Sequence, residues 1–515
     1  MGSIAGIDLG TTFSAVSVLD ALGVPQIVAN KDGTRLTPSA IFVKKDGSGC
    51  FVGESAVNSR KEYGCTDNCV RDIKRHMHES DYSENIMGHA YSPEEISAMI
   101  LRKVAQGVDK IDNVVISVPA LFGEAARSAT MRAANLAGLN VVGIVNEPTA
   151  AALYYAKEKD IDGNVIIFDL GGGTFDVTAG IINGYDLEVK ASSGSSHLGG
   201  RDFDQKLVDH FTEIYEKETG SPLYGEKSEL AEIEDFAEEK KKDLSIKDSV
   251  NIRLRGTAST VRTSLKRSDF EEMISKDITK AMMCVETALD EAGWSTSDVD
   301  NVLLVGGSSR IPAFRNMLSD MFGMEPISSA NVDECVALGA SIYCGLRLMD
   351  ENPASVPPGI AQALKSISLK EVTNKAFGTI AIGLDEHTRQ DVRENAIIIK
   401  KNTRIPCSCC ETFYTHVEGQ QGIICTITQT DDNDATDPSL VRIVCTEDLE
   451  LPLGLPYNAP IKVTYSYNSD GMMECVFCHE ASNTVMELNI DTKSGNSGVE
   501  KKVSQKINTS KIIIE

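Results

Sequence analysis

One short pattern occurs twice in the chain. Ile-Asp-Leu-Gly-Thr-Thr at residues 7–12 reappears in altered form as Phe-Asp-Leu-Gly-Gly-Gly-Thr at residues 168–174. In each copy an apolar strand ends at an aspartate and continues into a turn of glycine and threonine. A repeated strand, acid and turn predicts a duplicated domain in which two related lobes face each other across a cleft.

Both turns have the composition of a phosphate-binding loop. Glycine can adopt positive φ and lets backbone N–H groups approach phosphate oxygens closely, and threonine adds hydroxyl donors. Asp8 and Asp169, at the strand ends, are then placed to hold the water shell of Mg²⁺. Taken singly, each turn is equally typical of a tight β-hairpin. Neither copy fits the Gly-x-x-x-x-Gly-Lys-Ser/Thr loop of P-loop enzymes.

A third glycine turn, Val-Gly-Gly-Ser-Ser-Arg, lies at residues 305–310. It follows an expected strand at residues 302–305 and precedes an expected helix at residues 311–322. Arg310 is placed to lie over a planar base, which would make this turn the nucleoside side of the cleft. By itself the same pattern is typical of helix capping.

The periodicity of the chain changes near residue 350. Before it, short β-branched runs alternate with amphipathic helices, which predicts an α/β domain over residues 1–350. Residues 351–374 begin with Glu-Asn-Pro-Ala-Ser-Val-Pro-Pro-Gly and predict an interdomain linker. The short β-rich runs of residues 375–491 predict an antiparallel β-sandwich. Residues 492–515 predict a polar tail.

Composition excludes several classes of function. The 515 residues carry 75 Asp and Glu against 50 Lys and Arg, and the net charge of −25 would repel nucleic acid and anionic lipid. No apolar run approaches the ~20 residues of a membrane-spanning helix, and the N-terminus lacks the features of a signal peptide. The 13 cysteines, an odd count in a long chain, predict free thiols in a reducing cytoplasm.

Six motifs in order carry a family resemblance. They lie at residues 6–12, 118–122, 146–152, 169–176, 197–200 and 306–312. Together they resemble the ATPase domain of the seventy-kilodalton heat-shock chaperones, the DnaK-like or HSP70-like family. The resemblance implies an actin-like (ribonuclease H-like) ATPase domain, a linker and a peptide-binding β-sandwich. It also implies slow ATP hydrolysis that controls binding to unfolded or extended polypeptide, with ATP or ADP, Mg²⁺ and K⁺ as cofactors. J-domain and nucleotide-exchange co-chaperones are the further partners it implies.

The resemblance assigns catalytic roles to four residues. Lys74 matches the catalytic lysine, although a lone lysine in a helix is usually solvated. Glu147, Asp169 and Thr174 would orient the attacking water. The segment around Glu147 is by itself also a good helix start, because Pro148 follows directly.

The resemblance also implies the cofactor contacts and a relay. Asp8 and Asp169 would hold Mg²⁺ and flanking K⁺ through water, and Pro119 and Arg127 would relay the nucleotide state to the second domain. Lys242 stands where the family usually has arginine, which weakens flat stacking on adenine. The implied nucleotide contacts are Gly10, Thr11, Thr12, Phe13, Gly171, Gly172, Gly173, Thr174, Gly199, Gly200, Glu238, Lys241, Lys242, Ser245, Gly306, Gly307, Ser308, Arg310 and Asp333.

The second half departs from the family pattern. Lys365 and Lys370 bring positive charge to the linker, where the family has an acidic residue and leucines, and this predicts altered coupling between the domains. Residues matching the peptide pocket are Phe413, Ile423, Cys425 and Ile427. Strand alternation alone would equally well bury these four in a β-core. No helical lid is expected after the sandwich.

Seven of the cysteines lie between residues 407 and 479. Cys-x-Cys-Cys at residues 407–410 and Cys-x-x-Cys-His at residues 475–479 could supply thiolates to zinc. The alternative is that they are buried free thiols, which behave as small hydrophobes, because Cys475 and Cys478 on one strand point to opposite faces.

These observations predict a lidless, DnaK-like, ATP-dependent chaperone of the cytoplasm. The alternative from another class is an ATP-sensing scaffold whose β-sandwich docks one dedicated protein, which would suit the altered linker and peptide region. A small-molecule kinase on the same fold is disfavoured, because the residues that match the γ-phosphate pocket, Lys74 and Glu147, belong to the hydrolytic set that the resemblance implies.

Overall fold

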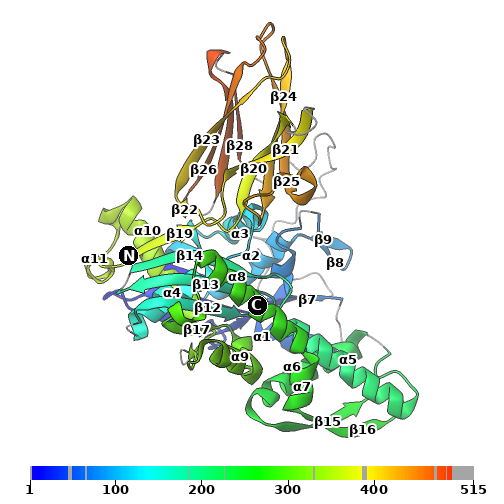
Figure 1. Cartoon of the computed structure of the whole chain (residues 1–515). Coiled ribbons are helices and arrows are strands. Elements are labelled where there is room, and N and C mark those ends of the chain that lie inside the picture. Colours follow the sequence, from blue (N-terminus) through cyan, green and yellow to red (C-terminus); the bar gives the residue numbers. More distant parts are fainter. Residues whose placement is uncertain are drawn as a thin grey trace.

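The computed structural model describes residues 3–44, 49–63, 67–79, 81–159, 161–184, 186–225, 227–328, 331–384, 391–468, 472–482 and 484–489. Figure 1 shows two lobes, each built on a β-sheet, with a group of long strands standing above them. Among the described residues, no helix is both long and apolar enough to cross a membrane. The expected tail and the expected absence of a lid concern residues outside the described ranges.

The two lobes have the same sheet topology. Strand order is β11-β10-β1-β2-β3 in the first lobe and β18-β17-β12-β13-β14 in the second. In each, an antiparallel meander pairs in parallel through its first strand with a later strand, β1 with β10 and β12 with β17. The strands are β1 Ser3–Leu9, β2 Phe13–Leu19, β3 Pro25–Val28, β10 Ile111–Val118, β11 Val141–Asn146, β12 Gly163–Leu170, β13 Phe175–Asn183, β14 Asp186–Ser195, β17 Asn301–Val305 and β18 Ile327–Ser328. The repeated motif thus occupies the same place in both sheets, at the ends of β1 and β12.

Two helices lie between the sheets. One apolar cluster joins α4 (Glu147–Lys159) and α10 (Cys335–Glu351) to β1, β10, β12 and β17. The helices cross so closely that only glycine fits at position 339. A Cβ on Gly339 of α10 would lie 1.7 Å from the Ala150 carbonyl oxygen of α4. On its other face the first sheet packs against α2 (Pro93–Ala105) and α3 (Glu124–Ala137). One shared core therefore positions the ends of β1 and β12.

Smaller elements extend each lobe beyond its sheet. The first lobe carries β4 Thr37–Pro38, β5 Ala40–Val43, β6 Cys50–Val52, α1 Glu54–Tyr63, β7 Cys69–Arg71, η1 Ile73–His76, β8 Glu84–Ile86 and β9 His89–Tyr91. The second lobe carries α5 Gly200–Thr219, α6 Lys227–Ile246, β15 Ser249–Arg255, β16 Thr260–Lys266, α7 Arg267–Met273, α8 Ser275–Ala292, η3 Gly307–Arg310 and α9 Pro312–Phe322. The elements of the second lobe share one apolar core with β12 and β13.

The C-terminal part is a sandwich of two four-stranded antiparallel sheets, β21-β20-β24-β25 and β23-β26-β27-β28. One apolar cluster draws residues from both sheets. The strands are β20 Ala376–Leu384, β21 Asp391–Ile399, β23 Cys407–Tyr414, β24 Gly422–Thr430, β25 Arg442–Glu450, β26 Pro460–Tyr467, β27 Met473–His479 and β28 Thr484–Asn489. Period-two alternation of apolar residues therefore leads here to the architecture expected from it.

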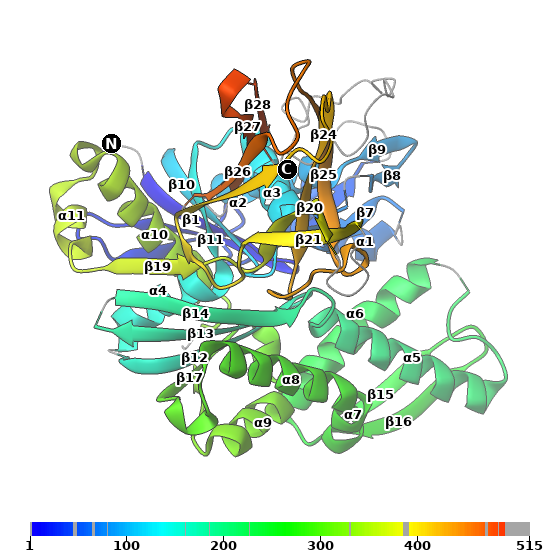
Figure 2. The same ribbon diagram turned by 45° about the horizontal axis from the view of Figure 1, so that its top comes forward.

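The segment between the α/β part and the sandwich contains a strand, which the sequence pattern does not predict. After α11 (Pro358–Leu364), β19 (Ser368–Val372) pairs in parallel with β14 and antiparallel with β22 (Arg404–Ile405). Figure 2 shows β19 beside β14 along the edge of the second sheet. The strand forms because β14 offers an unpaired edge, which is a tertiary cause that leaves no periodicity in the sequence.

Candidate functional site

A cavity of about 460 Å³ lies between the lobes where the three glycine turns meet. The turns follow β1, β12 and β17, and η1, α4 and α6 complete the walls. Of the residues matched to nucleotide contact or catalysis, only Gly173 and Gly199 do not line it. These two pack directly behind the wall, since a Cβ on Gly199 would lie 2.6 Å from the Gly173 backbone nitrogen. The structure thus brings together residues that lie more than 300 positions apart in the sequence.

The first two turns leave no room for residues larger than glycine. Between the turns, a Cβ on Gly172 would lie 2.0 Å from Thr12 Oγ1. Within the first turn, a Cβ on Gly10 would lie 2.1 Å from the Phe13 carbonyl oxygen. The third turn needs glycine for its conformation, because Gly306 has φ of +77°. The backbone is therefore available along the floor of the cavity, as a phosphate chain requires.

One end of the cavity gathers acidic groups around one lysine. Lys74 of η1 is buried and donates a hydrogen bond to Glu147 at the start of α4. Ser117 donates to Asp8 Oδ1 at 2.7 Å. Burial and the neighbouring Glu147 raise the pKa of Asp8 and of Asp176 to about 7, and they raise the pKa of Asp169 as well. Among the described side chains here, carboxyl groups outnumber the ammonium group, so this end of the cavity favours cations.

These residues fit Mg²⁺ that is held together with a nucleotide. Carboxylate oxygens are the protein ligands that Mg²⁺ prefers, and this ion usually keeps several waters and binds substrate phosphates. Within the described ranges no three His, Cys, Asp or Glu side chains are arranged to hold a metal by themselves. Asp8 and Asp169 are the residues that would hold the ion, with water and phosphate oxygens as its further ligands.

The opposite end of the cavity is lined by α6 and the third turn. Lys241 Nζ lies 2.7 Å from Asp204 Oδ1 and donates to the Gly200 carbonyl oxygen at 2.7 Å. Arg310 Nη1 donates to Asp333 Oδ2 at 2.6 Å. Lys242 Nζ lies 5.9 Å from the centre of the Phe13 ring. This end presents flat and cationic groups suited to a nucleoside.

Ion pairs join the two lobes beside the cavity, and two of their residues, Arg201 and Glu238, also line it. Arg60 of α1 donates to Glu234 and Asp235 of α6, at 2.5 and 2.7 Å. Arg71 of β7 reaches Asp235 at 3.0 Å and Glu238 at 3.2 Å. One arginine of the second lobe reaches back to the first: Arg201 of α5 donates to Asp72 of the first lobe at 3.0 Å. It also donates to Glu238 of its own lobe at 3.0 Å. We call these seven residues the cleft clamp.

Burial alone would raise the pKa of Glu238, but the cations around it outweigh burial. Arg201 and Lys242 lower this pKa to about 2. Glu238 therefore stays ionised over the physiological range, and so keeps its attraction for both arginines that reach it.

Several residues at the site escaped the sequence analysis. Asp176 closes the second motif and joins the buried acidic group. Arg75 follows Lys74 directly, and its guanidinium donates to the Gly173 carbonyl oxygen at 3.0 Å and to Asp202 at 2.6 Å. The position of Asp176 inside a quoted motif was a usable signal. Nothing in the sequence indicates the partners of Arg75.

The expected relay residues lie between the cavity and β19. Arg127 of α3 donates to the Phe122 carbonyl oxygen at 2.9 Å and to Asn146 Oδ1 at 2.5 Å. Asn146, the residue before Glu147, donates in turn to Glu371 Oε1 of β19 at 3.2 Å. Pro119 begins the adjoining turn, where its carbonyl oxygen accepts from the Phe122 N–H at 3.1 Å.

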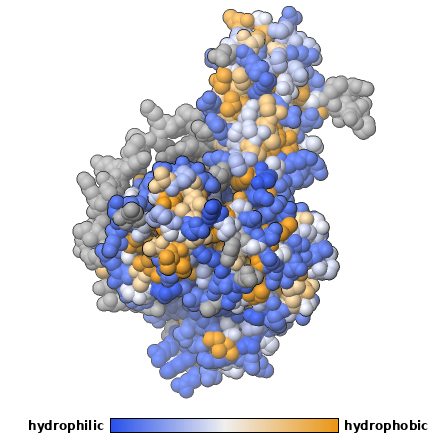
Figure 3. Space-filling view, turned by 90° about the vertical axis from the view of Figure 1, so that its left-hand side faces the viewer, coloured by the Kyte–Doolittle hydropathy of each residue, from blue (hydrophilic) through white to orange (hydrophobic). Residues whose placement is uncertain are grey.

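The four candidate peptide residues face the interior of the sandwich to different degrees. Cys425 and Ile427 are fully buried in its core, whereas Phe413 and Ile423 are half-buried at its margin. Exposed apolar residues lie elsewhere on these strands, among them Ile382 of β20 and Ile424 of β24. Figure 3 shows apolar patches on the surface of the sandwich at the top of the view.

The cysteines of the sandwich do not assemble into a zinc site within the described residues. Cys425 and Cys475 are buried beside Tyr465, and burial raises the pKa of Cys425 to about 12. Without a metal nearby, such a thiol stays protonated at neutral pH. The described cysteines are free thiols.

Fold and cleft together define a class: a two-lobed nucleotide-binding protein with an attached β-sandwich. A family model described as Hsp70 protein matches residues 4–511, and the chain belongs to the Hsp70 family. It is therefore a chaperone of the HSP70 type, and the resemblance carried by the six motifs is confirmed. The family unites an actin-like ATPase with a β-sandwich, hydrolyses ATP, binds ATP or ADP with Mg²⁺, and acts on unfolded polypeptides with co-chaperones.

Proposed function

We propose that this chain is a DnaK-like chaperone in which slow ATP hydrolysis in the cleft controls the binding of extended polypeptide to the sandwich. The observation that carries the proposal is the buried Lys74–Glu147 pair beside Asp8 and Asp169 at the acidic end of the cavity. Such a pair is suited to the transfer of a phosphoryl group to water.

Phosphoryl transfer needs positioning and charge neutralisation more than covalent chemistry. In our proposal Lys74 neutralises charge on the transferred group, while Glu147, Asp169 and Thr174 orient the attacking water. Bound Mg²⁺ would add positive charge at the phosphate oxygens. The excess of buried carboxyl groups also supports K⁺ beside Asp8 and Asp169, because one divalent ion leaves part of that charge unbalanced.

A continuous set of contacts supports coupling between hydrolysis and the sandwich. Glu147 is adjacent to Asn146, which bonds both Arg127 and Glu371. Movement of Glu147 on hydrolysis would therefore reach β19 within two contacts. Lys370 does not oppose this docking, because its Nζ lies 3.8 Å from Glu188 of β14.

A separation of strands supports peptide binding by the sandwich. β20 pairs with β24 only through Ala376–Gly378 and Thr428–Thr430. Where this pairing ends, the Tyr465 hydroxyl lies between the two strands. It donates to the Gly378 carbonyl oxygen of β20 at 2.9 Å and lies 3.5 Å from the Thr426 carbonyl oxygen of β24. We propose that an extended peptide adds to the free backbone edges here. Phe413 and Ile423 would contact its side chains, with Cys425 and Ile427 forming the layer beneath.

ATPase measurements with and without peptide test the proposal. We expect a panel of unrelated apolar peptides to bind weakly and to change steady-state hydrolysis, with Lys74→Ala as the hydrolysis-deficient control. Binding of almost none of them would refute chaperone action and favour the scaffold alternative, which the burial of Cys425 and Ile427 suits. The free thiols among the described cysteines support a reducing compartment, and we propose the cytoplasm.

A further inference from the structure

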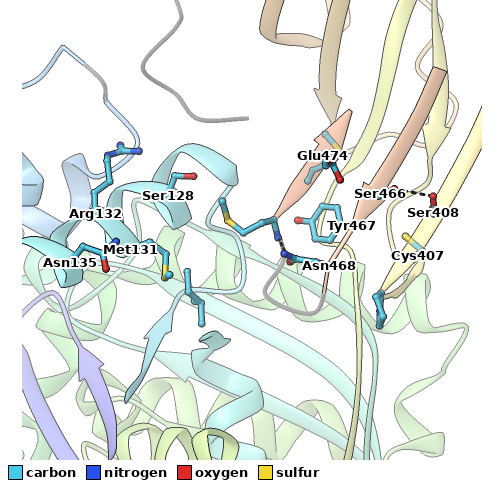
Figure 4. Close-up of a pocket in the computed structure, with 14 residues that line it drawn as sticks. Ser128, Met131, Arg132, Asn135, Cys407, Ser408, Ser466, Tyr467, Asn468 and Glu474 are labelled. Carbon is cyan, nitrogen blue, oxygen red and sulfur yellow. Dashed lines mark hydrogen bonds between the residues drawn. The ribbon is translucent and has the colours of Figure 1, made fainter. Parts of the chain in front are cut away.

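Helix α3 of the first lobe faces the sandwich across a partly hollow joint. A cavity of about 930 Å³ opens between them. Figure 4 shows Ser128, Met131, Arg132 and Asn135 of α3 on one side, and Cys407, Tyr467, Asn468 and Glu474 of the sandwich on the other. The cavity lies along the later part of α3, so the close packing between the two parts is found where the helix begins.

At the start of α3 the two parts are in close contact. Asn374, just before β20, donates to the carbonyl oxygens of Ala120 at 2.5 Å and Phe122 at 3.1 Å. Glu124, the first residue of α3, is 2% exposed, and Tyr467 of β26 is 3% exposed. Both side chains are therefore enclosed at the joint, and separation of sandwich and lobe would return them to water.

The Glu124 carboxyl group is enclosed with few donors around it. The Tyr467 hydroxyl and the Met473 backbone N–H are directed at it, but neither reaches a carboxyl oxygen with full hydrogen-bond geometry. A second cavity, of about 60 Å³, adjoins Gly123 and Glu124, and there Gln429 Nε2 is also buried without a partner. An ionised carboxylate in such surroundings is costly, whereas a neutral carboxyl group is tolerated.

The charges around Glu124 do not compensate for ionisation. Arg127, on the same helix, directs hydrogen bonds to Phe122 and Asn146. The other elements that meet here bring titratable groups in addition to Tyr467. They are Glu371 of β19, Cys475 of β27, Arg442 of β25 and His78 of the first lobe. Two carboxyl groups thus share the neighbourhood of one buried arginine.

We propose that Glu124 is a proton switch at this joint: the sandwich docks on α3 when the Glu124 carboxyl is protonated, and docking weakens when the carboxyl is ionised. The chain would thereby couple its domain arrangement to pH around neutrality, independently of nucleotide.

The sign follows from proton linkage. In the docked form, burial raises the pKa of Glu124 from 4.5 to about 7, against the opposing effect of Arg127. In the undocked form the group is exposed and keeps its ordinary pKa. The docked form therefore binds more protons between these two values, and docking strengthens as pH falls through 7. The expected change in the docking equilibrium between pH 8 and pH 6 is about tenfold.

Hydrogen exchange of the full chain measures this equilibrium. Amides of β19 should exchange faster when the sandwich undocks, so their protection, corrected for the intrinsic rate at each pH, reports docking. We expect wild type to lose about tenfold protection from pH 6 to pH 8. Glu124→Gln, which resembles the protonated group, should keep high protection at both. Glu474→Gln, which removes an exposed carboxylate of the same joint, should behave as wild type.

A second variant tests the proposal independently, in case Glu124→Gln misfolds locally. The Tyr467 hydroxyl lowers the pKa of Glu124, so Tyr467→Phe should move the midpoint of the protection curve to higher pH. The proposal fails if Glu124→Gln keeps the pH dependence of wild type, which would assign it to another group such as His78. It also fails if Glu124→Gln lowers protection at both pH values, or if Tyr467→Phe leaves the midpoint in place.

Discussion

The cleft clamp leads to a quantitative prediction for nucleotide release. Its best-enclosed member is Arg60, whose side chain is 5% exposed and holds Glu234 and Asp235 of the opposite lobe. Because a nucleotide lies between the lobes in our proposal, it leaves only when these contacts open. Arg60→Ala removes both contacts, while Arg71 still holds Asp235 at 3.0 Å, so that acid keeps a partner.

The size of the effect follows from the exposure of the partners. A hydrogen bond to a charged group contributes ~1.5–3 kcal/mol when well enclosed, but the Glu234 and Asp235 side chains are 37% and 20% exposed. Solvent screening reduces each contact to about 1 kcal/mol. Loss of about 2 kcal/mol should speed release of ADP roughly 30-fold, since 1.4 kcal/mol corresponds to a factor of ten.

Stopped-flow release of a fluorescent ADP analogue tests this prediction. Wild type should also release faster at high salt, because screening weakens partly exposed ion pairs, and Arg60→Ala should lose much of that salt dependence. Arg253→Ala, on the exposed face of β15, is the matched control. Release by Arg60→Ala within a factor of about two of wild type would refute the clamp as a barrier to nucleotide exit.

Four further predictions concern other parts of the molecule. Lys74→Ala should bind ATP but hydrolyse it about 100-fold more slowly, because one preorganised donor is worth ~3 kcal/mol; near-normal single-turnover hydrolysis would contradict this. Trypsin cleavage at Lys365 and Lys370 should differ between ATP and ADP if β19 responds to nucleotide, and identical patterns would favour the scaffold. Because the pKa of Glu238 is lowered from 4.5 to about 2, its ionised carboxylate stabilises the fold fully above pH 4.5, and this stabilisation is lost as pH falls from 4.5 to 2. Glu238→Gln should therefore flatten the acid-unfolding curve between these pH values. Tyr465→Phe removes a buried hydrogen bond to the Gly378 carbonyl oxygen and should lower the free energy of unfolding in urea by about 1 kcal/mol.

Local patterns in the sequence point to much of the cavity lining. Asp8, Thr12 and Gly172 belong to short motifs whose residue types carry their own chemistry, and the structure brings them into one cavity. Lys74 was found only through the family resemblance, because a lysine in a short helical segment gives no sign of burial. Its place in the cavity depends on Glu147, 73 positions away.

Features created by tertiary pairing could not be predicted in this way. Arg60 and Asp235 lie in ordinary charged helices, and only the closure of the lobes makes them partners. Likewise β19 is too short and too mixed in composition to show a strand period. No sequence pattern marks Glu124, since its burial depends on a sandwich that begins some 250 residues later.

The pairing of β19 also determines how sharply the molecule can change state. This strand is bonded on one side to β14 and on the other to β22, so one backbone segment closes two ladders at once. An intermediate with the strand half detached would leave amide and carbonyl groups of three segments unsatisfied together. If β19 detaches at all, we therefore expect it to detach cooperatively from both ladders. A graded signal in the cleft would then emerge at the sandwich as a change in the proportion of two discrete forms.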